Sequence, residues 1–185
     1  MAFYRRRLPH LHIPGQPIFI TWRLQGSLPA NRSFPPEMNS GEAFVAMDRL
    51  LDQAPEGPMW LKQPEIAQMV VDALFHREEP LRHFSLHNFV VMPNHVHMLV
   101  TPSVPVPKLM HSLKLRTARE ANRLLRLTGQ PFWQSESYDH LVRSSEEFGK
   151  IARYIELNPV NAGFVSTPED FPWSSARPVG NRPQV

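Results

Sequence analysis

RHFSLHNFVVMPNHVHMLVTP, residues 82–102, holds two apolar runs separated by the pair Pro93–Asn94. Each run has the composition of a strand, and the two-residue connection predicts a tight hairpin. Because successive side chains of a strand point to opposite faces, His95 and His97 share one face of the second strand. Two imidazoles placed in this way can chelate one divalent ion. The alternative is a half-exposed strand whose solvent face happens to carry imidazoles.

Composition alone makes this pair weak evidence. Nine histidines in 185 residues predict roughly 0.4 His-x-His pairs by chance, and His10 and His12 form a second pair. The second pair lies between Pro9 and Pro14 in a segment that we expect to be irregular. Since no strand would fix its convergence, the hairpin pair is the better metal-site candidate.

The remaining segments predict an α+β fold around this hairpin. Residues 17–26 are rich in β-branched and aromatic residues and predict a first strand. Helical patterning covers residues 42–54 and resumes at Pro64, with Ile66, Val70, Ala73 and Leu74 on one stripe. A basic helix follows at 108–127, a kinked fourth strand at 131–143, and a last helix opens on a Ser N-cap. Pro159 is expected to stop that helix near Asn158.

This order is typical of a ferredoxin-like antiparallel sheet, βαββαβ, with helices on one face and an additional C-terminal helix. We expect a basic N-terminal arm at 1–16, one domain at 17–165, and an irregular Pro- and Ser-rich tail at 166–185. Cysteine is absent, so a disulfide framework, a thiolate site and zinc-finger recognition are excluded. Neither a signal peptide nor a run of about 20 apolar residues is evident, so we expect a cytoplasmic protein without a membrane partner.

The positive charge is concentrated in two places. The net charge is +3, and the sequence pI is about 9.6. The candidate DNA-binding residues are Arg5, Arg6, Arg7, Lys114, Arg116, Arg119, Arg123 and Arg126. The four arginines of the basic helix follow 3, 4, 3 spacing and form one stripe. Such a stripe can follow a phosphate backbone, or it can be an ordinary solvated face.

The last helix carries a second candidate group. Tyr154 and Asn158 in YIELN are four residues apart, so the phenol and the amide lie on the same helical face. A tyrosine nucleophile and an amide-oxygen metal ligand can be presented together in this way. In the alternative interpretation Tyr154 packs on the sheet and Asn158 caps the helix.

Four motifs resemble one known family: VVMPNHVHMLV, FWQSESYDHLVR, RYIELNPVNAGFV and PEDFPWSSA. In this order they are similar to those of the REP-associated tyrosine transposases, relatives of the single-tyrosine insertion-sequence (IS200-like) transposases in the HUH endonuclease superfamily. The likeness extends from IPGQPIFITWR to PWSSA, nearly the whole chain. It implies that His95 and His97 are metal ligands, that Tyr154 is the nucleophile, and that Asn158 is a candidate third ligand.

The resemblance also implies an activity. It predicts a metal-dependent single-stranded DNA endonuclease and strand transferase that cuts near palindromic hairpins through a 5′-phosphotyrosine intermediate, with Mg²⁺ or Mn²⁺ as cofactor. The enzyme would be a monomer or a homodimer, nucleoid-associated when bound to DNA. One alternative is a domesticated hairpin-binding protein that no longer cleaves. A weaker one is a phosphoesterase of small nucleotides, which would need no tyrosine.

Overall fold

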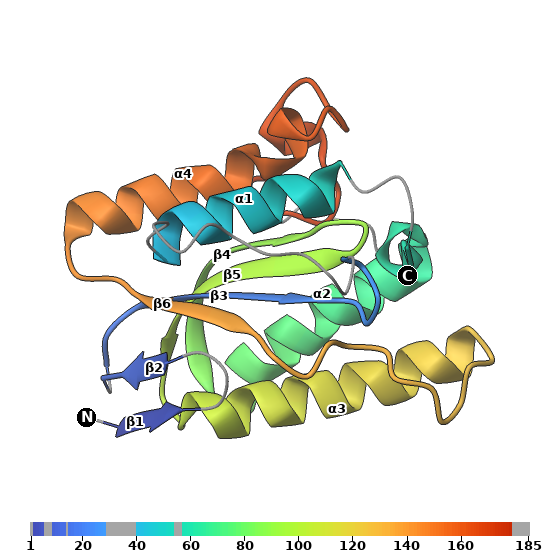
Figure 1. Ribbon diagram of the computed structural model, residues 1–185, viewed down its shortest axis with the longest axis horizontal. Coiled ribbons are helices and arrows are strands. Elements are labelled where there is room, and N and C mark those ends of the chain that lie inside the picture. The colour runs from blue at the N-terminus through green and yellow to red at the C-terminus, as the bar shows by residue number, and fades with distance from the viewer. Residues whose placement is uncertain (1, 6–8, 14, 29–39, 54–56, 179–185) are drawn as a thin grey trace.

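A four-stranded antiparallel sheet forms the centre of the computed structural model, which describes all residues except 1, 6–8, 14, 29–39, 54–56 and 179–185 (Figure 1). Its strands, in spatial order, are β4 (Phe84–Val91), β5 (His95–Pro102), β3 (Ile18–Arg23) and β6 (Tyr138–Leu141). This order, in which the first and third strands of the βαββαβ unit lie in the middle, is the ferredoxin-like arrangement. The predicted fold class is confirmed.

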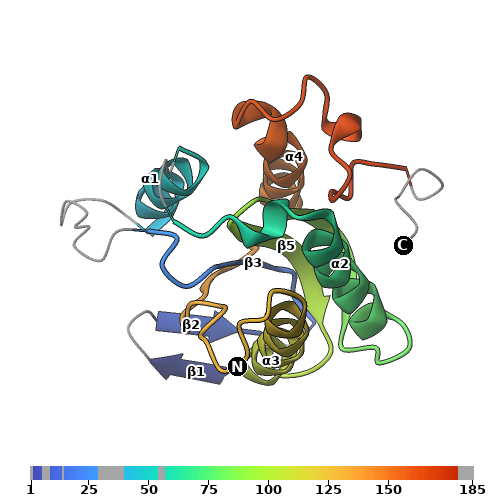
Figure 2. The same cartoon turned by 90° about the vertical axis from the view of Figure 1, so that its right-hand side faces the viewer.

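Helices cover both faces of the sheet (Figure 2). One face is covered by α2 (Pro64–Glu78) and α3 (Val106–Leu124), and the other by α1 (Ser40–Asp52) and α4 (Ser145–Asn161). Short 3₁₀ turns lie at Trp60–Lys62 and Pro168–Asp170. The sequence predicts all four helices, but the expected position of α1 on the face of α2 and α3 is corrected: α1 lies on the opposite face, beside α4.

Alternation along β5 divides the core into two layers. Val96, Met98 and Val100 pack with α2 and α3 in the larger layer. His95, His97 and Leu99 point the other way, and Leu99 packs there with Phe44 of α1 and Ile155 of α4. The histidine face is therefore buried beneath α1 and α4 and does not face solvent, so the simple solvent-face interpretation of the pair is wrong.

The hairpin itself forms as predicted. The Met92 amide donates to the His95 carbonyl at 2.9 Å and closes the Pro93–Asn94 connection. Across the sheet His97 is paired with Thr21 of β3 and Val90 of β4. Both histidines thus lie on an inner strand with a hydrogen-bonded neighbour on each side, which fixes the direction of their side chains.

Three local expectations are corrected. His10 and His12 lie in β2 (Pro9–His12), which pairs with β1 (Ala2–Arg5); Pro9 takes the first position of its strand, where a missing N–H is tolerated. The fourth strand is shorter than predicted, since Trp133 makes only an isolated bridge with Leu24 before β6 begins. Pro159 does not stop the last helix: α4 continues to Asn161 with Pro159 inside it, and the missing N–H removes one backbone hydrogen bond.

The predicted N-cap of the last helix is confirmed, and the C-terminal tail is anchored to the sheet. Ser144 caps α4, since its side chain accepts a hydrogen bond from the Glu147 amide at 3.1 Å. In the C-terminal tail Trp173 acts as an anchor: its carbonyl accepts from the Val91 amide at 2.9 Å, and its side chain packs against both core layers. The tail therefore continues the edge of the sheet beside β4.

Candidate metal and nucleophile site

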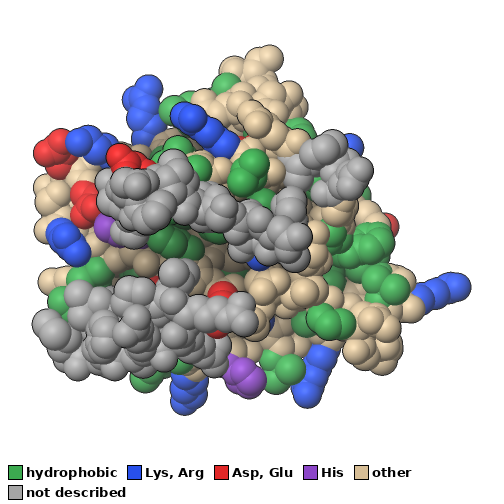
Figure 3. All heavy atoms as spheres, viewed as in Figure 1, with side chains coloured by type: hydrophobic (Ala, Val, Ile, Leu, Met, Phe, Trp, Pro, Cys, Tyr) green, Lys and Arg blue, Asp and Glu red, His purple; other side chains and the backbone are tan. Residues whose placement is uncertain are grey.

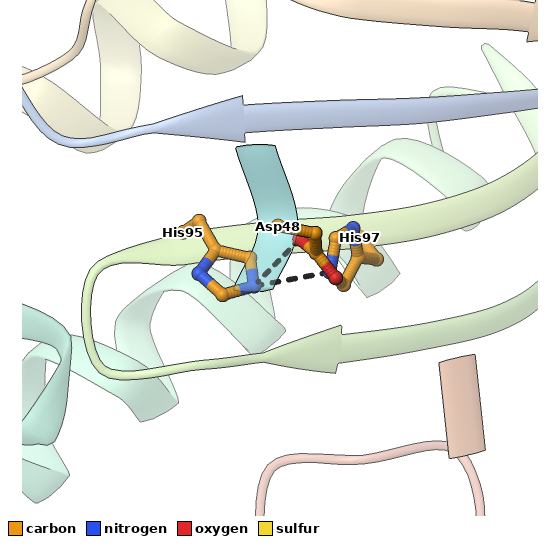
Figure 4. A group of neighbouring side chains, drawn as sticks. All are labelled: Asp48, His95 and His97. Carbon is orange, nitrogen blue, oxygen red and sulfur yellow. Dashed lines mark hydrogen bonds and ion pairs between the residues drawn. The ribbon is translucent and has the colours of Figure 1, made fainter. Parts of the chain in front are cut away.

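The two histidines of β5 point at each other beneath α1. Both side chains are fully buried, and their Nε2 atoms are 3.0 Å apart (Figure 4). On the far side of each ring, Nδ1 of His97 lies 2.7 Å from Thr21 Oγ1, and Nδ1 of His95 lies 2.7 Å from Asn94 Oδ1. The outer nitrogens are thus engaged, and both inner nitrogens face a common point.

Asn94 sets the tautomer of His95. Its amide nitrogen donates to the Leu51 carbonyl at 2.8 Å, so its amide oxygen must face the imidazole. That oxygen can only accept, and the proton of His95 is therefore on Nδ1. Nε2 keeps a lone pair, as in metal-binding histidines whose second nitrogen donates to a fixed acceptor.

A carboxylate completes the group. Asp48 of α1 places Oδ1 3.5 Å from Nε2 of His95 and 3.2 Å from Nε2 of His97. The three donor atoms form a triangle with edges of 3.0 to 3.5 Å. Ligands about 2.1 Å from a common ion lie roughly 3.0 to 3.4 Å from each other. The donor set therefore fits a divalent cation without rearrangement.

The other oxygen of Asp48 faces α4. Oδ2 accepts hydrogen bonds from the Tyr154 hydroxyl and, at 3.1 Å, from the Asn158 amide nitrogen. The amide oxygen of Asn158 is buried and accepts no hydrogen bond within the described ranges, which leaves it available as an oxygen ligand. The structure thus brings together the four predicted site residues, around one aspartate that was not predicted.

Burial and charge set the protonation of the group. Burial, followed by the neighbouring His97, lowers the pKa of His95 to about 3, so its imidazole is neutral, as a metal ligand must be. Burial would raise the pKa of Asp48, but His97 and His95 outweigh it and hold this pKa below its ordinary range. Burial and the Asp48 carboxylate raise the pKa of Tyr154 above its ordinary value of 10. The phenol therefore remains protonated while it faces Asp48.

Aromatic rings form one wall of the site. Phe44 of α1 stacks on Tyr138 of β6, with ring centroids 4.5 Å apart and planes 23° apart. Phe19 of β3 lies edge-on to Phe44, and it stacks on His97 at 5.6 Å. Burial raises the pKa of Tyr138, the other tyrosine beside the site. Of these two tyrosines, Tyr154 is the one whose hydroxyl donates to Asp48.

The candidate DNA-binding residues of α3 lie on the opposite face of the sheet from this group. Lys114 donates to the carbonyl groups of residues 134, 135 and 136, and Arg123 pairs with Glu120 at 2.6 Å. Arg116 and Arg119 line an open groove of about 1170 Å³ between α2 and α3.

The remaining candidate DNA-binding residues lie outside α3. Arg126 is exposed just beyond α3. Arg5 belongs to β1, and Arg6 and Arg7 are outside the described residues. In the face shown in Figure 3, the visible Lys and Arg side chains stand at separate places around the rim. Their role in DNA binding stays a prediction.

Sequence reasoning missed Asp48 and Asn94, although each left a signal. Phe44, Asp48 and Leu51 follow i, i+4, i+7 spacing, so an acid occupies the apolar stripe of a helix. A buried carboxylate in such a stripe requires a partner. Asn94 was assigned only to the turn, whereas its side chain joins the hairpin to α1.

Fold and site together define a ferredoxin-like domain in which a candidate metal centre lies beside a tyrosine. Residues 64–158, just over half of the chain, match the model of the family described as "Transposase IS200 like". The chain belongs to this family. The matched residues include the histidine pair, Tyr154 and Asn158, but not α1.

Comparison with individual proteins agrees with this assignment. The REP-associated tyrosine transposase of Escherichia coli K12 is 26% identical over 95 residues, which are 51% of this chain and 55% of that protein. The match thus spans about half the length of the curated relative. A solved REP-associated tyrosine transposase bound to a REP hairpin has the same fold, with a TM-score of 0.54, 22% identity, and coverage of 98% of this chain and 87% of that one. The predicted resemblance is confirmed.

None of the helices in the part of the chain that the structure describes combines the length and the apolar character that a bilayer crossing requires.

Proposed function

We propose that this protein is a metal-dependent single-stranded DNA endonuclease and strand transferase that cuts near palindromic hairpins, with Tyr154 as its nucleophile. The observation that carries the proposal is the meeting of His95, His97 and Tyr154 at one carboxylate, Asp48. A histidine pair on a strand and a tyrosine on a separate helix have no packing reason to converge on a buried charge. A phosphoesterase of small nucleotides would leave the tyrosine unexplained.

His95, His97 and Asp48 would hold the ion, and the amide oxygen of Asn158, which has no hydrogen-bond partner among the described residues, would be a further ligand. Two neutral nitrogens with two oxygens suit Mn²⁺ and are acceptable to Mg²⁺. When bound, the ion supplies a Lewis acid that polarises the scissile phosphate and offsets its developing negative charge. The outer-nitrogen contacts of Thr21 and Asn94 keep both imidazoles oriented for this role.

Tyr154 would carry out the covalent step. Its Oη forms a bond to phosphorus while the bond from phosphorus to the 3′ oxygen of the preceding nucleotide breaks. The phenolic proton leaves Oη and ends on that 3′ oxygen. The products are a 5′-phosphotyrosine on the protein and a free 3′ hydroxyl. In the reverse direction a 3′ hydroxyl attacks the phosphotyrosine, so a strand is rejoined or transferred without external energy.

The proposed partner is single-stranded DNA that bears a palindromic hairpin. The related transposase whose structure is matched was solved with a REP hairpin. In this chain the exposed arginines of α3 offer phosphate contacts, and the arginines at 5–7 remain candidates as well. We place this activity in the cytoplasm, in a monomer or a homodimer.

Covalent capture tests the proposal. The protein is incubated with labelled hairpin-bearing single strands and Mn²⁺ or Mg²⁺, and the products are separated on a denaturing gel. We expect a protein–DNA adduct that disappears in Tyr154→Phe and persists in the matched control Tyr138→Phe. Binding to these strands without an adduct would instead support the hairpin-binding alternative and refute cleavage. An adduct that survives Tyr154→Phe and is lost in Tyr138→Phe would reassign the nucleophile.

A further inference from the structure

Helix α1 closes the candidate site. The side chains of His95 and His97 are fully buried, and that of Asp48 is 3% exposed. The Tyr154 hydroxyl, which must approach phosphorus during cleavage, donates to Asp48. A phosphodiester in position for attack would have to stand between these groups. The observed position of α1 and a bound strand therefore exclude each other.

The contacts of Asp48 are those that a scissile phosphate requires. One carboxylate oxygen faces the two inner histidine nitrogens, at 3.5 and 3.2 Å, and the other lies against the nucleophile. A phosphodiester likewise has two non-bridging oxygens that share one negative charge, and one of them can face a metal centre while the phosphorus faces the attacking hydroxyl. Carboxylate and phosphate are both hard anionic oxygen ligands. Asp48 thus fills the position of the reacting phosphate.

Phe44 fills a neighbouring position. It precedes Asp48 by four residues, so both side chains project from the same face of α1. Its ring stacks face to face on Tyr138, and Phe19 borders both rings edge-on, at 5.2 and 6.3 Å. Aromatic stacking without base-specific hydrogen bonds is how single strands are held irrespective of sequence. Without Phe44, the face of Tyr138 would be open beside the nucleophile.

Asp48 supplies the polar contacts between α1 and the candidate site. A hydrogen bond from Asn94 to the Leu51 carbonyl joins α1 to the hairpin. Its outer face leaves Val45 and Leu50 about two-fifths exposed. In this position of α1, Asp52 has a buried carboxylate oxygen that finds no hydrogen-bond partner among the described residues. Release of α1 would also expose Phe44 and Leu51, which are 7% and 1% exposed. Loss of this apolar burial costs free energy, so the bound strand has to replace it.

We propose that α1 occupies the place of a nucleotide of the substrate strand and is displaced when the strand binds, with Asp48 in the position of the scissile phosphate and Phe44 in the position of the adjoining base on Tyr138. The inference rests on the proposed cleavage activity. Asp48 is then an exchangeable ligand of the metal centre, and Tyr138 is a positioning residue that holds a base beside the cut.

Two measurements test the displacement. In the first, Phe44→Ala weakens the seat of α1, and Val45→Ala is the matched control on its outer face. Only the fraction of the enzyme with α1 displaced can bind the strand, and this fraction limits the apparent affinity. We therefore expect Phe44→Ala to raise kcat/KM for adduct formation about fivefold or more, and Val45→Ala to leave kcat/KM unchanged. If α1 is instead a structural support, Phe44→Ala lowers kcat/KM, and this result would overturn the proposal.

The second measurement follows α1 directly and leaves Phe44 in place. The chain has no cysteine, so spin labels at Leu50→Cys and Phe164→Cys, both on exposed positions, report one distance by pulsed EPR. We expect this distance to change when a hairpin-bearing single strand and Mg²⁺ are added, while a Leu115→Cys and Phe164→Cys pair does not respond. An unchanged distance with bound DNA overturns the proposal. Absence of any adduct from the unaltered protein would contradict the cleavage activity instead, so the two failures are distinct.

Discussion

Asn94→Ala is expected to destabilise the protein and weaken its metal centre together. Asn94 is 2% exposed and makes two buried hydrogen bonds, one to the Leu51 carbonyl and one with His95 Nδ1. Truncation leaves both partners unsatisfied, at about 1 to 3 kcal/mol each, so the free energy of unfolding should fall by about 2 to 6 kcal/mol. Loss of a group that orients a ligand histidine should also weaken Mn²⁺ binding about 10- to 100-fold.

Guanidinium unfolding and Mn²⁺ titration measure the two effects. The matched control is Asn88→Ala on β4, which removes one hydrogen bond to Glu156 at a half-buried position. We expect it to cost about 1 kcal/mol and to leave Mn²⁺ affinity unchanged. An Asn94→Ala protein as stable as Asn88→Ala would refute the hydrogen-bond argument. A destabilised Asn94→Ala with native Mn²⁺ affinity would show that the tautomer of His95 is fixed without Asn94.

Three further predictions follow from single contacts. Burial and the charge of Asp48 raise the pKa of Asp52 from 3.8 to about 7, so the metal-free protein should lose stability as the pH rises from about 4 through 7. In EDTA, the free energy of unfolding of Asp52→Asn relative to the parent should increase by about 1 to 2 kcal/mol from pH 5 to pH 8, a range already reduced for the partial exposure of the carboxylate. An equal difference between the two proteins at both pH values would contradict the raised pKa of Asp52. Mn²⁺ should raise the melting temperature of the parent, and Asp48→Asn should need at least tenfold more Mn²⁺ for the same increase; identical titrations would remove Asp48 from the ligand set. Ser144→Ala should cost about 1 kcal/mol in thermal unfolding by removing the N-cap of α4, whereas the exposed neighbour Ser145→Ala should cost less, and equal losses would argue against the cap.

Local patterns predict the fold well because its decisive elements are local. The hairpin of residues 82–102 and the stripe of α2 are each encoded within 15 to 21 residues, and α2 begins and ends where the periodicity indicates. The limits of β6 and α4 are predicted less well. Tyr138 pairs with β3, whereas the backbone of the residues before it is held by loop contacts such as the hydrogen bond from Lys114 to the carbonyl of residue 134. Pro159 is tolerated in α4 because the end of the helix is already near. Tertiary contacts decide both limits.

Periodicity predicts that His95 and His97 share one face, and that Tyr154 and Asn158 share another, because each pair lies on one element; their roles come from the family resemblance. Asp48 was not predicted, since its role depends on which side of the sheet α1 occupies, and no local pattern encodes that choice. Once α1 lies over the histidine face, an acid in its apolar stripe has to meet buried cationic or metal-binding groups, because an unpaired buried carboxylate would cost several kcal/mol. The charge of Asp48 and the position of α1 are therefore mutually dependent: replacement of the carboxylate removes the main polar reason for α1 to stay, and release of α1 returns the carboxylate to water. That dependence would make α1 responsive to a competing anion such as a phosphodiester.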